Sequence, residues 1–199
     1  MSEKNFIYRY GSRYYLNLTN RCPCACTFCV RNQTDGLGDA DILWLEKEPT
    51  AEEVMAELRK RDLSDVPEIV FCGYGEPTER FDTLMEIARM AKSEFGKPLR
   101  LDTNGMGRLI TGRDIVKEMR GVIDSVSISL NAPDADEYLA VTKNEFGEKA
   151  YPELLSFIRD CRREISGVTV SVVGGSIPES SVERCAKMAE EMNVRFRVR

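Results

Sequence analysis

Histidine is absent from this sequence of 199 residues. It is the side chain most often used as a general base and is also a common metal ligand, so both uses are removed. Chemistry in an active site must therefore come from cysteine, carboxylates, lysine, tyrosine or a bound cofactor. Hydrolases that depend on a histidine base are disfavoured for the same reason.

Long apolar runs are also missing. No stretch approaches the roughly 20 apolar residues that span a bilayer, and residues 1–15 carry charge and tyrosine where a secretory leader needs an apolar block. We therefore expect a cytoplasmic protein with no membrane contact. The net charge of −5 gives no overall basic field of the kind that indicates nucleic-acid binding, although RFRVR at 195–199 is locally basic. A nucleic-acid partner is thus neither indicated nor excluded.

Repeats, low-complexity segments and flexible linkers are lacking too, which predicts a single domain over residues 1–199. Strand-like and helix-like segments alternate along the chain. The predicted strands span residues 13–19, 68–73, 99–103, 125–130, 168–173 and 195–199, and the predicted helices span residues 50–63, 79–96, 112–121, 151–165 and 178–193. Such alternation forms a parallel sheet with right-handed crossovers. Because a closed barrel has eight units in roughly 250 residues, the pattern predicts an α/β fold, a partial (β/α)6 TIM-like barrel that is laterally open.

Unusual loops follow five of the predicted strands, at the end of the sheet where parallel α/β folds place their sites. They contain four clustered cysteines, then GYGEPT, NGMG, NAPDAD and GGSIPES. Each loop alone could be ordinary turn chemistry, because Gly, Asn, Asp and Pro are common in any turn. Their shared position at one rim of the sheet predicts a functional site there.

Four cysteines lie within eight positions in NLTNRCPCACTFCVRN, residues 17–32. Disulfides between such close neighbours would be strained, and structural zinc usually takes two separated pairs of ligands. The remaining pattern is C-x3-C-x2-C, formed by Cys22, Cys26 and Cys29. Three thiolates can hold three irons of a [4Fe–4S] cluster and leave the fourth iron open for a substrate or cofactor. If Cys24 were a fourth ligand, that iron would be closed and a non-catalytic metal-binding or electron-transfer module would be favoured.

The C-x3-C-x2-C pattern, with Phe28 just before its third cysteine and its place after the first strand, resembles the radical S-adenosylmethionine (SAM) superfamily. The resemblance implies a partial barrel whose cofactors are a [4Fe–4S] cluster and SAM. The resemblance also implies that the cluster is held by Cys22, Cys26 and Cys29 and that its open iron binds SAM. An electron donor such as flavodoxin or ferredoxin is implied as well.

Further segments resemble the same superfamily in the same order. GYGEP at 73–77 is similar to the segment that receives the amino group of SAM, where Glu76 would pair with the ammonium. The other residues of that segment expected to contact SAM are Gly73, Tyr74 and Gly75. LRLDTNG at 99–105 resembles the third strand of glycyl-radical activating enzymes. It implies contacts to SAM, near a monovalent cation, for Asp102, Thr103 and Asn104.

The next strand departs from the activating enzymes, because Ser129 and Asn131 stand where those enzymes tend to carry an acid and a lysine. Their polar groups, and that of Ser127, can still hydrogen-bond the ribose hydroxyls or the carboxylate of SAM. The alternative is a polar alternation on a half-exposed strand. In VTVSVVGG, the resemblance implies apolar contact with the adenine from Val172 and Val173.

The size of the chain and its LTNRCPCACTFCVRN stretch look like the small TatD-linked radical SAM proteins, some of which act as queuine lyases. This implies an enzyme that cleaves SAM reductively to a 5'-deoxyadenosyl radical, which takes a hydrogen atom from a small molecule. The implied substrate is a 7-deazapurine, whose base would be released from its cyclopentenediol. Tyr74 would stack on that base. Its N–H edge would pair with a carboxylate from Asp35, Asp39 or Asp41, unless that loop is simply solvated.

Two other assignments stay open at this point. An activating enzyme would generate a glycyl radical on a protein partner, and a tRNA- or nucleoside-modifying enzyme would act on nucleic acid. The open side of the barrel would be covered by such a partner, by a second copy of the chain in a homodimer, or by the small substrate itself.

Overall fold

The computed structural model describes residues 6–199 of the chain. The strands are β1 (Ile7–Tyr10), β2 (Arg13–Leu16), β3 (Ile69–Phe71), β4 (Leu99–Thr103), β5 (Ser125–Ser129), β6 (Gly167–Val172) and β7 (Arg195–Val198). The helices are α1 (Ala51–Leu58), α2 (Phe81–Phe95), α3 (Gly107–Thr111), α4 (Ile115–Met119), α5 (Ala135–Thr142), α6 (Ala150–Glu164) and α7 (Glu179–Glu191). Short 3₁₀ turns are η1 (Val30–Asn32), η2 (Pro77–Arg80) and η3 (Gly147–Lys149).

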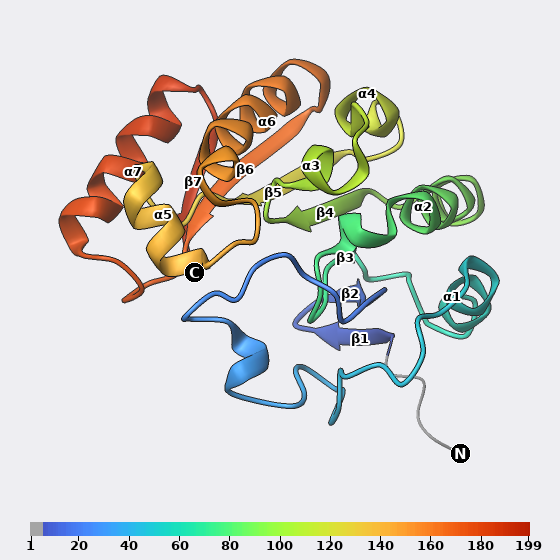
Figure 1. Cartoon of the computed structure of the whole chain (residues 1–199). Coiled ribbons are helices and arrows are strands. Elements are labelled where there is room, and N and C mark those ends of the chain that lie inside the picture. Colours follow the sequence, from blue (N-terminus) through green and yellow to red (C-terminus); the bar gives the residue numbers. More distant parts are fainter. Residues whose placement is uncertain (1–5) are drawn as a thin grey trace.

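All of these strands belong to one sheet, in the order β1-β2-β3-β4-β5-β6-β7. The strands from β2 to β7 are parallel, and β1 pairs with β2 in the antiparallel direction. Helices cover one side of the sheet, as Figure 1 shows, and the long loop between β2 and α1 lies on the other side. Within the described residues no pairing joins β1 to β7, so the predicted partial, open barrel is confirmed.

Three elements, β1, α3 and α5, lie outside the sequence-based prediction. β1 forms a hairpin with β2 through Gly11 and Ser12, and Gly11 adopts a left-handed φ of 60°, which glycine tolerates. α5 is capped by Asp134, whose carboxylate accepts a hydrogen bond from the Glu137 amide at 3.0 Å. The stretch NAPDAD looks like a plain turn in the sequence because it contains the capping residue of this helix, and the residues that cap helices are also common in turns.

Two predicted helices differ in length. The helix predicted from Thr50 begins with the expected capping box, in which Thr50 and Glu53 exchange hydrogen bonds of 3.2 and 2.8 Å, but α1 ends well before residue 63. The helix predicted at 112–121 is reduced to α4. Gly112, with a φ of 68°, instead terminates the preceding helix α3.

Side chains alternate along the strands and separate two faces of the sheet. Leu99, Leu101 and Ile128 have no exposed surface and lie in the core between sheet and helices. Arg100 and Asp102 alternate with the leucines of β4 and therefore point to the opposite side, which we call the concave face. The same alternation on β5, β6 and β7 places on this face Ser125, Ser127, Ser129, Thr169, Ser171, Arg195 and Arg197.

The concave face is therefore polar, and the core lies between the sheet and its helices. In the part of the chain that the structure describes, no helix has the length and apolar character needed to cross a membrane.

Candidate functional site

The clustered cysteines lie on the loop that leaves the C-terminal end of β2. This loop is joined to the end of α5 by its backbone. The Ala25 amide donates to the Thr142 carbonyl and the Thr27 amide to the Val141 carbonyl, each at 3.0 Å. The helix that sequence reasoning missed therefore holds the cysteine loop in place.

Arg31, in the turn directly after Cys29, connects three backbone segments around the loop. Its guanidinium donates to the carbonyl of Asn20 at 3.3 Å, of Cys24 at 3.2 Å and of Tyr74 at 3.4 Å. These carbonyls lie at the start of the loop, in its middle and in the loop after β3. Sequence reasoning did not single out Arg31, and the available signal was its place two residues beyond the last cysteine of the motif.

The predicted cluster ligands differ from Cys24 in exposure. Cys24 is 5% exposed, whereas Cys22, Cys26 and Cys29 are each partly exposed. Hydrogen bonding to Cys24 lowers the pKa of Cys22 and of Cys26, while burial raises the pKa of Cys29. Exposure therefore separates the three cysteines of the C-x3-C-x2-C spacing from Cys24.

Glu76, expected to meet the SAM ammonium, is only 4% exposed and already accepts four hydrogen bonds. Its Oε1 accepts from the Thr103 hydroxyl at 2.7 Å, and from the hydroxyl and amide of Thr78 at 2.7 and 3.2 Å. Its Oε2 accepts from the Asn104 amide at 2.8 Å. Burial raises the pKa of Glu76, and these hydrogen bonds oppose that rise. Glu76 therefore joins the end of β3 to the end of β4, and Oε2 is the oxygen with capacity left for a ligand.

Asn104 and Thr103, adjacent in the sequence, have different surroundings. The Asn104 amide nitrogen Nδ2 lies 3.7 Å from the Cys24 sulfur and 4.0 Å from the Cys22 sulfur, so it reaches the cysteine loop. Thr103 is 4% exposed, and its hydroxyl is hydrogen-bonded to Glu76. Thr103 thus orients the carboxylate, whereas Asn104 lies where a cluster-bound ligand would be.

Close packing within the chain explains why glycine occupies positions 73 and 75. A Cβ atom on Gly73 would lie 2.0 Å from Asn17 Oδ1. One on Gly75 would lie 2.3 Å from the carbonyl oxygen of Thr19 and 2.5 Å from that of Arg21. Thr19 and Arg21 lead directly into the cysteine loop, so the glycines allow the loop after β3 to pack against its entry.

The substitution Gly75→Ala is expected to destabilise the protein by about 1–3 kcal/mol, because the atoms in its way belong to backbone. Gly174→Ala is the matched control, since a Cβ there would meet its nearest atoms at 3.4 Å. The control should change the free energy of unfolding by less than about 0.5 kcal/mol. Urea unfolding measures both, and equal midpoints would contradict the close packing at Gly75.

Tyr74 does not fit the expected role of stacking on a base. It is 4% exposed and packs in a small apolar cluster with Tyr8 and Leu43. Its hydroxyl donates to the Thr34 carbonyl, and Trp44 meets its ring edge-on at 5.1 Å between centroids. Because the loop between η1 and α1 covers the ring, neither face is open to a substrate.

The acidic residues of that loop are engaged locally. Asp35 accepts a hydrogen bond from Trp44 Nε1 at 3.1 Å, and Asp39 accepts one from the Arg9 amide. Asp41 is exposed. These contacts favour the solvated-loop interpretation over a role in recognising a base.

The rim residues of β5 lie near the cysteine loop and retain polar capacity. Ser127 is 5% exposed and Asn131 3% exposed. Asn131 has a left-handed φ of 60°, and its Oδ1 is buried without a hydrogen-bond partner among the described residues. Ser129 Oγ accepts a hydrogen bond from Arg199 at 3.1 Å. A buried acceptor with no partner at the rim is what a bound ligand would satisfy.

Two other predicted contacts have different surroundings from those expected. Asp102 is ion-paired, with Oδ1 2.8 Å from Arg100 Nε. Burial raises the pKa of Asp102, and the positive charge of Arg100 opposes this. Val172 has no exposed surface and belongs to the core on the helical side, so it does not line the concave face. Val173, one residue on, alternates to the concave side.

A family model describes the relationship of this chain to known proteins. The model for the Radical SAM superfamily matches residues 16–189, from the end of β2 into α7. The chain belongs to the radical SAM superfamily.

Two curated relatives of the chain are both longer than it is. A putative glycyl-radical enzyme activating enzyme of Methanocaldococcus jannaschii is 31% identical over 73% of this chain and 58% of its own length. A probable dual-specificity RNA methyltransferase of Clostridium acetobutylicum is 29% identical over 81% of this chain and 44% of its own length. The chain thus spans about half the length of these relatives.

Solved structures share the radical SAM fold. Streptococcus suis SuiB bound to S-adenosylmethionine aligns over 92% of this chain and 37% of its own, with a TM-score of 0.67 and 16% identity. A radical SAM methyltransferase from Sphaerobacter thermophilus aligns over 96% of this chain and 57% of its own, with a TM-score of 0.63 and 20% identity. At these identities the likeness concerns the fold.

The cofactors of radical SAM enzymes are a [4Fe–4S] cluster and SAM, and the residues present fit them. The thiols of Cys22, Cys26 and Cys29 are free and lie on one anchored loop. No group of three Cys, Asp or Glu side chains in residues 6–199 converges on the position of a single metal ion. A cluster whose irons are held separately does not require such convergence. The unpartnered Asn131 Oδ1, at the rim after β5, supplies a buried acceptor for SAM.

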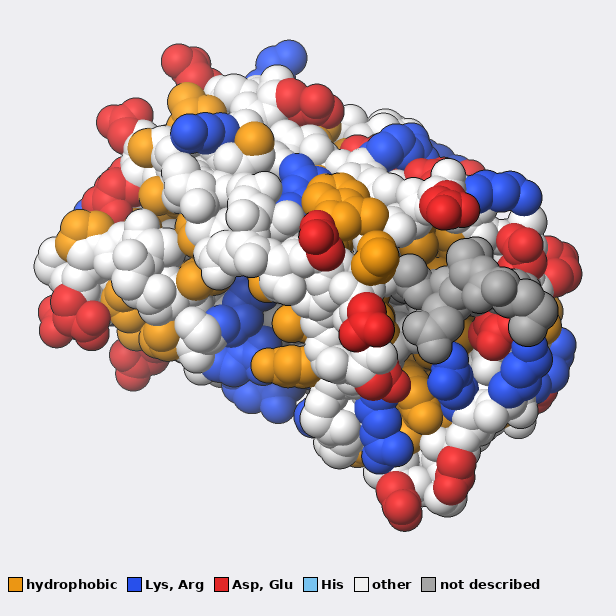
Figure 2. Space-filling view, turned by 90° about the horizontal axis from the view of Figure 1, so that it is seen from below, with side chains coloured by type: hydrophobic (Ala, Val, Ile, Leu, Met, Phe, Trp, Pro, Cys, Tyr) orange, Lys and Arg blue, Asp and Glu red, His pale blue; other side chains and the backbone are white. Residues whose placement is uncertain are grey.

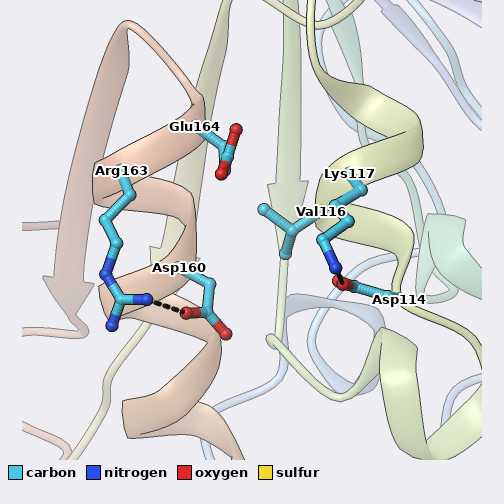
Figure 3. Close-up of a pocket in the computed structure, with 6 residues that line it drawn as sticks. All are labelled: Asp114, Val116, Lys117, Asp160, Arg163 and Glu164. Carbon is cyan, nitrogen blue, oxygen red and sulfur yellow. Dashed lines mark ion pairs between the residues drawn. The ribbon is translucent and has the colours of Figure 1, made fainter.

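A cavity of about 240 Å³ lies elsewhere, between α4 and α6 in the helical layer (Figure 3). Its charged lining is paired within each helix, Lys117 with Asp114 at 2.9 Å and Arg163 with Asp160 at 3.2 Å. Since these charges already have partners, we assign no function to this cavity.

Proposed function

We propose that this radical SAM enzyme cleaves SAM reductively and passes the radical to a substrate bound on the concave face. The exposure of the cysteines carries this proposal. Three cysteines in C-x3-C-x2-C spacing are partly exposed, and Cys24 is buried. An electron-transfer module would use a fourth cysteine ligand to close the cluster.

When bound, the cluster and SAM supply an electron and a 5'-deoxyadenosyl radical, while the protein binds, orients and excludes water. In this proposal the C-terminal end of α5 and the Arg31 guanidinium keep the cysteine loop in position. Oε2 of Glu76 accepts a hydrogen bond from the SAM ammonium, and Asn131 and Ser127 bind its ribose or carboxylate. None of these residues has to act as an acid or base, which agrees with the absence of histidine.

The proposed substrate is a small molecule, a 7-deazapurine whose base is released as in queuine lyases. The LTNRCPCACTFCVRN stretch and the polar hydroxyl and amide groups on the concave face support it. Because the ring of Tyr74 is covered, recognition of the base falls to polar side chains of the concave face that SAM does not use. The electron would come from a reductase such as flavodoxin or ferredoxin.

A second candidate function is the generation of a glycyl radical on a protein partner. It is favoured by the Methanocaldococcus jannaschii relative, which is named as an activating enzyme. Modification of tRNA or a nucleoside is a third candidate, since another relative is named as an RNA methyltransferase.

The test is anaerobic reconstitution of the cluster, followed by dithionite and SAM, with 5'-deoxyadenosine measured by chromatography. Absence of this product from a well-loaded cluster would refute the catalytic proposal. Addition of queuine should then yield a 7-deazaguanine base that has lost the cyclopentenediol, and this product is detectable by mass spectrometry. A glycyl radical seen by electron paramagnetic resonance in a partner, with no small-molecule product, would instead support the activating enzyme.

A further inference from the structure

The last strand of the sheet carries three arginines on one side. Phe196 of β7 packs against the core, so Arg195, Arg197 and Arg199 alternate to the concave face. In the register between strands, Arg197 lies beside Ser171. Figure 2 shows Lys and Arg side chains gathered near the middle of the side of the molecule seen from below. A protein with a net charge of −5 thus concentrates positive charge on its functional face.

These three arginines form no close ion pair in residues 6–199, although the charges of Arg199 and Arg197 act on Asp102 and oppose the rise in its pKa that burial causes. Within the described residues, none of them lies at ion-pair distance from a carboxylate, whereas Arg13 and Arg100 on the same sheet both pair with Glu68, at 2.6 and 2.7 Å. The guanidinium groups on β7 therefore keep donors available to an external anion.

The guanidinium of Arg199 reaches inward rather than out to solvent. It donates from Nη2 to Ser129 Oγ on β5 at 3.1 Å, and so crosses β6. A group held by Arg199 would therefore lie over the concave face, beside Ser129 at the end of β5.

A buried hydroxyl adjoins the same row. Ser171 is 1% exposed, and its Oγ has no hydrogen-bond partner among residues 6–199. It lies between Ser129 and Arg197 in the sheet register. Since buried polar groups are normally satisfied, this hydroxyl indicates a ligand that accepts a hydrogen bond.

We propose that Arg197 and Arg199, with the Ser171 hydroxyl, bind an anionic group of the substrate, a phosphate or a carboxylate. The inference rests on the proposed function and narrows its substrate class. Guanidinium groups hold the oxygens of either anion by paired, charge-assisted hydrogen bonds. If the substrate is a 7-deazapurine, its nucleotide carries such an anion and would bind more tightly than the free base.

The test is calorimetric titration of the reconstituted protein, with SAM bound, against inorganic phosphate and separately against malonate. We expect saturable binding that weakens about tenfold or more in Arg197→Gln and in Arg199→Gln, because each loses a charge-assisted hydrogen bond. Arg89→Gln is the matched control, as Arg89 is exposed on α2 in the helical layer. It removes the same charge and should bind both anions like the unmodified protein. Tighter binding of phosphate than of malonate supports a nucleotide-like substrate, and the reverse supports a carboxylate.

Three results would overturn the proposal. They are the absence of saturable binding by either anion, equal affinities in all three variants, and a parallel loss of SAM affinity in Arg197→Gln and Arg199→Gln. The last would assign the arginines to SAM. Formation of 5'-deoxyadenosine by the unmodified protein is measured separately, so anion binding can fail while the proposed function stands.

Discussion

Cys26→Ala is expected to lose the cluster and with it all formation of 5'-deoxyadenosine above background. Cys26 has a lowered pKa through its hydrogen bond with Cys24, and it lies in the middle of the C-x3-C-x2-C spacing. Removing one thiolate leaves two protein ligands for a cluster that needs three. Iron content per chain should fall from about four to near zero, together with the visible absorbance of the reconstituted protein. Cys22→Ala and Cys29→Ala should behave in the same way.

Cys24→Ala is the matched control for this series. Cys24 is buried and lies outside the C-x3-C-x2-C spacing, so its removal should leave iron content close to that of the unmodified protein. Loss of the cluster in Cys24→Ala, with retention in Cys22→Ala, would show that the ligand set is Cys24, Cys26 and Cys29.

Glu76→Gln should lower the free energy of unfolding by about 2–4 kcal/mol, because one buried carboxylate accepts hydrogen bonds from three residues. A glutamine keeps a single acceptor oxygen. Its amide nitrogen must face a donor, either the Asn104 amide or the donors of Thr78 and Thr103. The change should appear as a lower urea midpoint with an unchanged slope.

Glu86→Gln is the control for Glu76→Gln, because Glu86 is exposed on α2. It removes the same charge and should alter the free energy of unfolding by less than about 0.5 kcal/mol. If Glu76→Gln were as stable as this control, the carboxylate would not be the link between β3 and β4.

Much of the fold is predictable from local pattern. β4 and β5 follow the predicted strands closely, since apolar residues at alternate positions mark the side that meets the helices. β1 is harder because it is stable only as the partner of β2. α5 is harder to predict because its capping residue lies within a stretch that is also typical of a turn. Its role is to anchor the cysteine loop, and that contact between distant segments is not visible in the sequence.

The candidate site shows the same division between local and distant causes. The ligand spacing at Cys22, Cys26 and Cys29 is local and is visible in the sequence. The packing at Gly75 depends on Thr19 and Arg21, more than fifty residues earlier in the chain. Nothing in GYGEP indicates which segment approaches it, so a glycine that contacts the chain cannot be distinguished from one that contacts a ligand. The burial of Val172, by contrast, follows from a phase that the sequence does show, because Thr169 and Ser171 alternate with the valines of β6.

The contacts of Arg31 and α5 bear on how the cysteine loop behaves without its cluster. Many small metal-binding domains are unfolded until the metal arrives, because the metal itself organises their ligand loops. Here backbone hydrogen bonds and one guanidinium organise the loop through groups that are not ligands. Since these contacts do not involve the thiols of Cys22, Cys26 and Cys29, loss of the cluster should leave the loop joined to α5 and Arg31.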